Sequence, residues 1–400
     1  MVYFIFKVSN KDIWIFIAIY LDNCYKVVFM VDYSIKKYNR KIVYQLIYQA
    51  KQITKQEIAE RLKLSLPTVS SNLLELEQAD LIKKEDINES TGGRKPLAIS
   101  IKEQSRIAIG VSILKEGITF VALDLYAQLI RKQTVALVYD NSESYFKQYG
   151  QALNEFIDCL QIKKENFLGI TIAIQGIVSQ DGKKVIYGPI LNNQGLTLEK
   201  FEKSSDLPVK MIHDSHAAGL AELNFSEDNN DAIYLSLNHN LGSAVFMAGK
   251  VFQGNNYSST FEHMTLVENG RQCYCGKKGC FEAYCNEDAL LKNHTNMTLE
   301  EFYKQLRQKD QTAMQSWNDY FHYLALAIHN LTMVLDAPVI IGGKIASLFE
   351  NEDLDLLTKL VSDLDPLKFT VPDIKIGQCL KETAAIGAAL TDIKKFVAEI

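Results

Sequence analysis

The spacing of apolar residues divides the chain into a helical stretch and a longer stretch of alternating strands and helices. From Tyr38, apolar side chains recur three and four positions apart, which is the period of one helix face. A second helix is predicted to start at Thr54, with Glu57 as its capping-box partner. A third is predicted to start at Ser65, with Pro67 in its first turn. Two helices joined by so short a turn predict a helix-turn-helix.

A β-hairpin is predicted to follow the third helix. Residues 97–101 alternate as a returning strand, and TGGRKP (91–96) forms the tip, which places Arg94 and Lys95 on a glycine-flexible loop. Such a loop suits a wing that reaches phosphate or the minor groove. The outward face of the third helix is expected to present short polar groups to the major groove. The candidate DNA-binding residues are Ser65, Pro67, Thr68, Ser71, Asn72, Arg94 and Lys95. The alternative is a protein-interaction domain with a solvated basic surface.

Beyond Ile101 the chain predicts an α/β architecture, with helices covering a central sheet. No tandem repeat is visible in the sequence. The expected strands are 106–112, 118–125, 168–174, 232–237, 243–247 and 339–341, and the expected helices cover 145–160, 215–222 and 317–335.

Composition and charge distribution sharpen this division. The 400 residues are 47% hydrophobic and 23% charged, which indicates two or three globular domains and excludes a disordered chain. Residues 35–101 hold twelve Lys/Arg and eight Asp/Glu, so they carry +4, whereas the residues after 101 carry −9. A basic module joined to an acidic one indicates a nucleic-acid reader attached to another domain. Seven cysteines, four of them between 273 and 285, favour local metal chemistry in the cytoplasm over a disulfide framework.

The first 29 residues have an uncertain status. The apolar run 13–21 is shorter than the roughly 18 residues that a membrane-spanning helix needs, and no secretory signal precedes it. The hypothesis is that translation begins at Met30, so that residues 1–29 reflect the choice of start site.

One cluster of residues has the composition of a zinc site: His263, Cys273, Cys275 and Cys280. Three thiolates and one imidazole form a tetrahedral ligand set without an open position, which predicts one structural Zn²⁺ per chain. Gly276 and Gly279 allow a tight turn around the metal, and Cys285 is left outside the set. The alternative is a cluster of reduced core cysteines.

The motif His-x9-Cys-x-Cys-Gly-x-x-Gly-Cys-x-Glu, ending at Glu282, resembles the signature of the ROK family of sugar kinases and sugar-responsive repressors. The resemblance runs from Met30 to the C-terminus, because the GGRKP wing is similar to that of the xylose-repressor branch. HDSHAA (213–218) stands at the Asn-Asp-Ala-Asn segment of the family, and AIGAA (385–389) at its C-terminal helix.

This resemblance implies a winged helix-turn-helix (residues 30–101) followed by a two-lobed, actin-like (RNase H-like) ATPase fold (102–400). The smaller lobe would span about 105–225 plus the C-terminal helix, and the larger lobe about 226–385. It also implies that Asp214, the base position of the kinases, faces a sugar together with His263 and Glu282. The candidate sugar-binding residues are His213, Asp214, Glu262, His263 and Glu282.

The sugar site departs from the family pattern at three positions. Thr260 replaces a carboxylate, Glu262 replaces a glycine, and His213 replaces an asparagine. Glu262 could supply the missing carboxylate or be a solvated charge. Asp214 could contact the sugar or cap the helix that follows it.

The two phosphate loops depart further. SILKEG (112–117) stands where the family has Asp-x-Gly-Gly-Thr-Lys, and NHNLGSA (238–244) keeps one of the expected glycines. Leu114 and Lys115 would obstruct the approach of phosphate to the backbone, and Glu116 would repel it. Neither ATP binding nor catalysis is therefore expected, and Asp214 would be a vestigial base. The glycine pair 342–343 is interpreted as fold geometry.

The sequence therefore predicts a cytoplasmic repressor of carbohydrate-utilisation genes. Its expected partners are double-stranded operator DNA, a sugar or sugar-derivative effector, and a second copy of the chain in a homodimer or higher oligomer. No membrane association is expected. The alternatives are an ATP-dependent sugar kinase and a regulator controlled by a protein partner.

Overall fold

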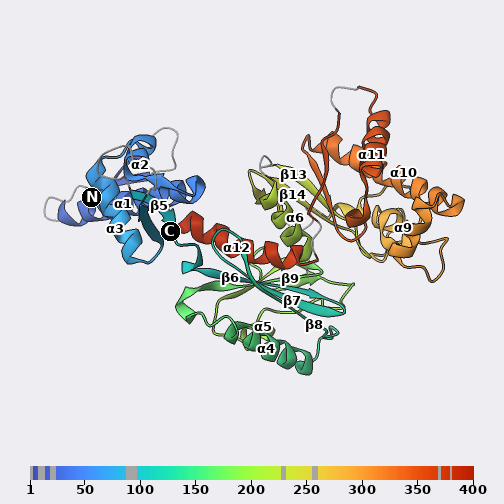
Figure 1. Ribbon diagram of the computed structural model, residues 1–400, viewed down its shortest axis with the longest axis horizontal. Helices are drawn as coiled ribbons and strands as arrows, with labels where there is room; N and C mark the ends of the chain where they lie inside the picture. The colour runs from blue at the N-terminus through green and yellow to red at the C-terminus, as the bar shows by residue number, and fades with distance from the viewer. Residues whose placement is uncertain are drawn as a thin grey trace. The chain divides into compact units, whose positions relative to one another are not determined.

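The chain forms two compact units. The computed structural model describes residues 3–7, 14–18, 24–86, 97–226, 231–254, 260–367, 371–378 and 381–400, with side-chain positions from Ile35 onward. The first unit comprises residues 1–105 together with 394–400, and the second comprises residues 106–393. Figure 1 follows the chain through both units.

The residues up to 105 that the structure describes contribute three helices and two small sheets to the first unit. Its elements are β1 (Tyr3–Lys7), β2 (Trp14–Ala18), α1 (Cys24–Ala50), β3 (Ile53–Thr54), α2 (Lys55–Leu62), α3 (Leu66–Gln78), β4 (Ile82–Asp86) and β5 (Leu97–Ile101). The predicted hairpin is present, because β4 and β5 pair antiparallel from Ile82 opposite Ile101. The short strand β3, which was not expected, extends this sheet in the order β3-β5-β4. Helix α1 begins at Cys24, earlier than the helical pattern from Tyr38 indicated.

The second unit contains two lobes, each built on a five-stranded sheet with its own core. The first sheet consists of β6 (Ile107–Leu114), β7 (Gly117–Leu123), β8 (Leu129–Val135), β9 (Phe167–Ile174) and β12 (Val209–His213). The helices α4 (Glu143–Asp158) and α5 (Glu199–Glu202) cover one face of it (Figure 1). The hairpin β10 (Ile177–Val178) and β11 (Val185–Tyr187) follows β9.

The second sheet consists of β13 (Ala232–Ser236), β14 (Gly242–Met247), β15 (Lys250–Val251), β16 (Val339–Gly342) and β17 (Ile374–Ile376). Helix α6 (Asp214–Phe225) packs closely against β13 and β14. The contact is so close that a side chain at Gly219 would collide with Phe246 of β14 and Tyr234 of β13. The remaining helices are α7 (Glu282–Cys285), α8 (Glu287–Leu290), α9 (Leu299–Arg307), α10 (Gln311–Val334), α11 (Asn351–Leu364) and α12 (Thr383–Glu399). Helices α9 to α11 contribute buried side chains to the core of this lobe.

The two sheets have the same topology although the sequence shows no repeat. The first sheet has the order β12-β9-β6-β7-β8, and the second has the order β17-β16-β13-β14-β15. In both, the first three strands in sequence form an antiparallel meander, and the last two add in parallel beside the first strand. The architecture is therefore α/β, as predicted, with a duplicated sheet.

The predicted glycine turn after β16 has a steric cause. Gly343 has a φ of +93°, and a Cβ atom there would lie 2.5 Å from the carbonyl oxygen of Leu237. The backbone of Leu237 also donates to the carbonyl of Gly342. Close packing against Leu237 therefore explains why glycines stand at this turn, and no bound nucleotide is needed to explain them.

The C-terminal helix α12 does not belong wholly to the smaller lobe. Its first part packs on the first sheet, where a Cβ at Gly110 would collide with the Ala385 carbonyl. Residues 394–400 belong to the first unit. Assigning all of α12 to the smaller lobe was therefore wrong for its last turns. Their contacts with α1 join residues far apart in the sequence, so no local pattern indicated them.

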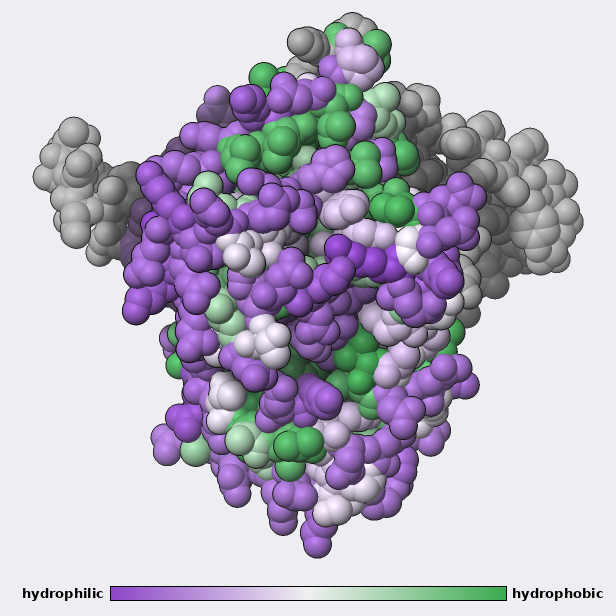
Figure 2. All heavy atoms as spheres, turned by 90° about the vertical axis from the view of Figure 1, so that its right-hand side faces the viewer, coloured by the Kyte–Doolittle hydropathy of each residue, from purple (hydrophilic) through white to green (hydrophobic). Residues whose placement is uncertain are grey.

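No helix in the described part of the chain is long and apolar enough to cross a membrane. Figure 2 shows one face of the molecule, on which hydrophilic residues predominate and a hydrophobic patch lies near the upper edge.

Candidate functional site

Local hydrogen bonds fix the first turns of α2 and α3. Thr54 and Glu57 form the predicted capping box of α2, which ends at Lys63 in the left-handed conformation (φ 54°). Ser65 caps α3, because its Oγ accepts from the backbone N–H of Thr68 at 3.2 Å. Pro67 lies in the first turn of α3 as expected. This is the tight turn of a helix-turn-helix.

Asn72 was expected on the DNA-facing side of α3, and this expectation was wrong. Its side chain is only 2% exposed and lies on the buried face with Val69, Leu73 and Leu76. The side-chain amide donates to the Thr68 carbonyl at 2.8 Å. At 100° per residue, position 72 lies about 40° from Leu76, near the centre of the buried face, so its polarity misled the assignment.

Of the other predicted DNA-binding residues, Ser65, Pro67 and Ser71 are exposed, and Thr68 is half-buried beside the Ser65 cap. The wing strands are present, but Arg94 and Lys95 lie outside the described residues. Their contact with DNA stays a prediction.

The predicted metal ligands come together. One ligand atom from each of His263, Cys273, Cys275 and Cys280 lies within 4.8 Å of all the others. The Sγ atoms of Cys275 and Cys280 are 3.7 Å apart, and the Cys273 Sγ is 3.7 Å from the His263 Nδ1. A tetrahedral ion with bonds of about 2.3 Å to sulfur requires ligand separations of roughly 3.8 Å. The donor set and its spacing therefore fit a metal ion of the size and preference of Zn²⁺.

The backbone of this loop depends on its two glycines. Gly276 and Gly279 have φ values of +90° and +79°, and a Cβ at Gly279 would lie 1.7 Å from the Val267 carbonyl oxygen. Cys285 lies outside the cluster, buried, with its thiol against the Tyr320 carbonyl at 3.9 Å.

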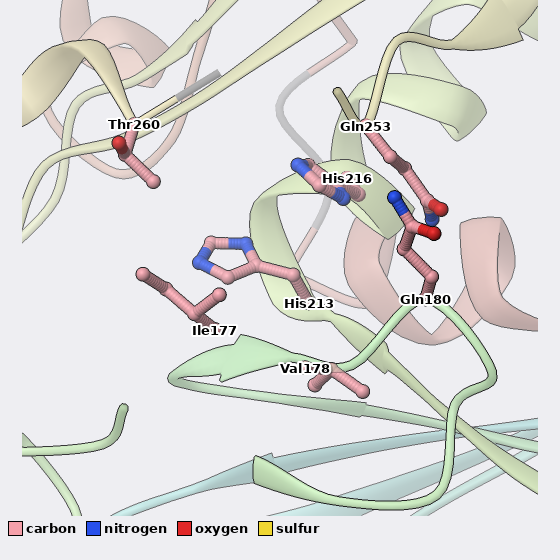
Figure 3. A pocket seen from close by; sticks show the side chains of 7 residues that line it. All are labelled: Ile177, Val178, Gln180, His213, His216, Gln253 and Thr260. Carbon is pink, nitrogen blue, oxygen red and sulfur yellow. The ribbon is translucent and has the colours of Figure 1, made fainter. Parts of the chain in front are cut away.

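A small pocket lies where β12 meets α6 (Figure 3). It has a volume of about 20 Å³, which is room for one water molecule, since an ordered water needs about 10–15 Å³. In Figure 3 the side chains of His216, Gln180 and Gln253 converge on one side of the pocket, and His213 points toward Ile177. The lining residues are Ile177, Val178, Gln180, His213, His216, Gln253 and Thr260.

The two histidines of the pocket are neutral at pH 7. Burial lowers the pKa of His213 to about 4 and that of His216 to about 3, and for His216 the neighbouring His213 adds to the effect. Their ring centroids lie 5.0 Å apart, and the two ring planes are tilted by 43°. His213 also caps α6, because its Nδ1 accepts from the Ser215 N–H at 3.1 Å. Asp214 is therefore not the cap, which removes the structural alternative considered for it.

The carboxyl groups of Asp214, Glu262 and Glu282 lie near enough for the charges of the other two to act on Glu262. Glu262 is 5% exposed and accepts from the Ser243 hydroxyl at 2.6 Å, so the interpretation as a solvated charge was wrong. Burial raises the pKa of Glu262 to about 8, with repulsion from Glu282 and Asp214 as further contributions. Burial also raises the pKa values of Asp214 and Glu282. Burial in a low-dielectric environment therefore disfavours the charged form of all three acids.

Glu282 is hydrogen-bonded to residues of the segment 238–244 from within the protein. Its carboxylate accepts from the Leu241 N–H at 2.7 Å and from the Asn240 amide at 3.1 Å. The backbone N–H of Leu241 therefore already has an acceptor inside the protein. At the first loop, β6 runs directly into β7 through an exposed turn at Lys115 and Glu116.

Of the predicted sugar-binding residues, His213 lines the pocket. His263 belongs to the group of potential metal ligands. Glu262 and Glu282, each one or two positions from one of those ligands in the sequence, are buried. Sequence reasoning missed His216, Gln180 and Gln253. His216 could have been predicted as a site residue, because it stands at the second asparagine position of the Asn-Asp-Ala-Asn segment. The two glutamines come from loops with no motif to mark them.

Comparison with known proteins agrees with this division of the chain. The profile described as "ROK family" matches residues 108–394, and that described as "Winged helix-turn-helix DNA-binding" matches residues 36–83. The xylose repressor of Bacillus spizizenii is 24% identical over 315 residues, which cover 77% of this chain and 82% of the repressor. The DNA-binding transcriptional dual regulator NagC of Escherichia coli is 28% identical over 268 residues, or 66% of each chain.

Among solved structures, a ROK family transcriptional regulator described as a homolog of the E. coli MLC protein superposes with a TM-score of 0.77. The match covers 91% of this chain and 97% of that one at 21% identity, so it shows a shared fold.

Proposed function

The chain belongs to the ROK family, and from this premise we propose that it is a sugar-responsive transcriptional regulator that represses carbohydrate-utilisation genes. The observation that carries the proposal is a capped helix-turn-helix in the same chain as a ROK unit (residues 106–393) whose phosphate loops are altered. The basic first unit would bind operator DNA, and the acidic ROK unit would bind the effector. Two copies of the chain would place paired recognition helices on an inverted repeat. The cytoplasmic location stays a prediction.

The DNA-binding part is tested by selecting duplexes from a random pool with the purified, full-length protein. Enrichment of an inverted repeat is the expected result, and a pool that stays random after repeated rounds contradicts the proposal. Sedimentation of the protein with the enriched duplex measures how many copies bind.

The wing gives a second test of the same function. Arg94→Ala is expected to weaken binding to all duplexes and to reduce the salt slope by about one, because one phosphate contact is lost. A slope equal to that of the unmodified protein would remove Arg94 from the interface. Lys115→Ala, in the exposed β6–β7 turn, is the matched control.

The effector is proposed to bind at the pocket beside His213 and His216, with Asp214, Glu262, His263 and Glu282 as the nearby polar groups. The neutral lining, with two imidazoles, two amides and a hydroxyl, supports a ligand rich in hydroxyl groups. Because the pocket has room for about one water, a sugar must widen it, and this widening would couple the ligand to the conformation of the ROK unit.

A thermal-shift panel of sugars and sugar phosphates tests the effector site. A hit is expected to raise the melting temperature of the protein and to lose that effect in His216→Ala, but not in His239→Ala, whose side chain is 69% exposed. A panel without hits supports control by a protein partner instead.

The ROK unit is proposed to lack kinase activity and to hold one structural zinc ion through His263, Cys273, Cys275 and Cys280. The absence of kinase activity is supported by the Glu282 carboxylate, which already accepts from the Leu241 N–H. The side chains of Leu114, Lys115 and Glu116 in the segment 112–117 also support it. ATP-dependent phosphorylation of any hexose in the panel would contradict it. Metal analysis is expected to give one zinc per chain. The zinc content should be reduced in Cys280→Ser but not in Cys159→Ser, which changes an exposed cysteine outside the cluster.

A further inference from the structure

One face of α3 is left free for contact with another molecule. The buried residues of the helix are Val69, Asn72, Leu73 and Leu76. At 100° per residue, the opposite side is a stripe with the spacing four, three, four. Every residue of this stripe is exposed: Pro67, Ser71, Leu74 and Gln78.

The stripe carries no charge, and the acidic residues of α3 are bound to neighbouring elements. Glu75 pairs with Lys36 and Arg40 of α1, and Glu77 pairs with Lys84 of β4. These pairs reduce the repulsion that two glutamates would exert on a phosphate backbone. The helix has no lysine or arginine of its own, so phosphate contacts must come from other elements of the unit.

Leu74 is the unusual member of the stripe. Its side chain is 54% exposed, although it stands on the face that a helix-turn-helix inserts into the major groove. A single exposed leucine elsewhere on a surface needs no explanation. Here it lies between Ser71 and Gln78, at the centre of the face where bases are read.

The chemistry of the groove gives this leucine a partner. Guanine is read mainly by arginine or lysine, and the stripe has neither. The apolar group that the major groove offers is the C5-methyl group of thymine. Resting on the DNA-binding function proposed above, we propose that Leu74 is a specificity-determining residue that contacts a thymine methyl group in each half of the operator.

Replacing thymine by uracil tests this contact, because it removes the methyl group and leaves the hydrogen-bonding edge unchanged. In the duplex enriched by selection, each thymine is replaced in turn, in both halves together, and dissociation constants are measured by fluorescence anisotropy at constant salt. For the unmodified protein, one position is expected to weaken binding about fourfold per half-site, the value of one buried methyl group.

The decisive comparison is the same scan with Leu74→Ala. At the sensitive position this variant is expected to bind the thymine and uracil duplexes equally, whereas Leu66→Ala should keep the full uracil effect. Leu66 is a matched control because it is also exposed on α3, at 46%, but lies about 100° from the stripe. Circular dichroism and sedimentation of each variant report its fold and association.

Two results overturn the proposal while leaving the DNA-binding function intact. One is a uracil scan that is identical for the unmodified protein and Leu74→Ala. The other is a change in association state in Leu74→Ala with unchanged uracil sensitivity, which would make Leu74 a contact between copies. If no duplex is enriched at all, both the DNA-binding function and this inference fail.

Discussion

Asn72 is a polar residue on the buried face of α3, and only the nitrogen atom of its side-chain amide forms a hydrogen bond. The Nδ2 atom donates to the Thr68 carbonyl, whereas the Oδ1 atom has no hydrogen-bond partner among the described residues. A buried acceptor without a partner costs about 1–3 kcal/mol. Asn72→Leu, which keeps the branching and the number of heavy atoms of the side chain, is therefore expected to raise the free energy of unfolding of the first unit by about 1 kcal/mol.

Urea denaturation of the full-length protein, followed by hydrogen exchange in α1 to α3, measures this change. The bases preferred in the selected duplex should stay the same, because Asn72 does not face the groove. An altered base preference would mean that Asn72 reaches DNA, as its polarity first indicated.

His213 and His216 make the stability of the ROK unit depend on pH. Their folded-state pKa values, about 4 and about 3, lie below the ordinary value of 6.5, so between pH 6.5 and about 4 the unfolded chain binds more protons. Stability should therefore fall as the pH falls through this window. For His213 the loss is on the order of 3 kcal/mol.

The double variant His213→Asn/His216→Asn removes both imidazoles and is expected to flatten this part of the pH profile. Denaturation at pH 7, 6, 5 and 4 gives the slope, and His239→Asn, at an exposed position, should follow the unmodified protein. Equal slopes in all three proteins would show that His213 and His216 do not cause the loss of stability at acidic pH.

At the scale of elements, the start of α3 depends on a single hydroxyl group. The Oγ atom of Ser65 accepts from the Thr68 N–H, so Ser65→Ala is expected to cost about 1 kcal/mol. The first turn of α3 would fray, and affinity for the selected duplex should fall about fivefold. Ser70→Ala is the matched control, since Ser70 lies inside the helix, where alanine is favourable. Equal losses in both variants would show that the cap is not responsible.

Such local features were predictable from the sequence, because a cap or a glycine turn involves residues a few positions apart. The Thr54–Glu57 box, the Ser65 cap and the hairpin of β4 and β5 were all predicted correctly. The metal cluster was also predicted, since its ligand types and spacing are distinctive. The strand β3 and the glutamines of the pocket were missed because tertiary contacts define them. Asn72 was misplaced because polarity was given more weight than helical phase.

At the scale of the molecule, the first unit is not complete within residues 1–105. The Phe396 ring lies edge-on against the buried Tyr44 ring at 6.1 Å, and the Gln45 amide donates to the Val397 carbonyl at 3.1 Å. An edge-to-face aromatic pair contributes about 0.5–1.5 kcal/mol beyond the area it buries. The last turns of α12 should therefore stabilise the DNA-binding unit.

Phe396→Ala is expected to lower the stability of the first unit by about 2 kcal/mol, because the ring pair and part of the apolar burial are lost. Amide exchange in α1 and α3 should then be up to about 30-fold faster, while exchange in β6 and β13 of the second unit stays unchanged. Lys395→Ala, at the exposed neighbouring position, should exchange like the unmodified protein. Uniformly faster exchange in both units would instead place Phe396 in the core of the whole molecule, and unchanged exchange in α1 would remove it from the DNA-binding unit.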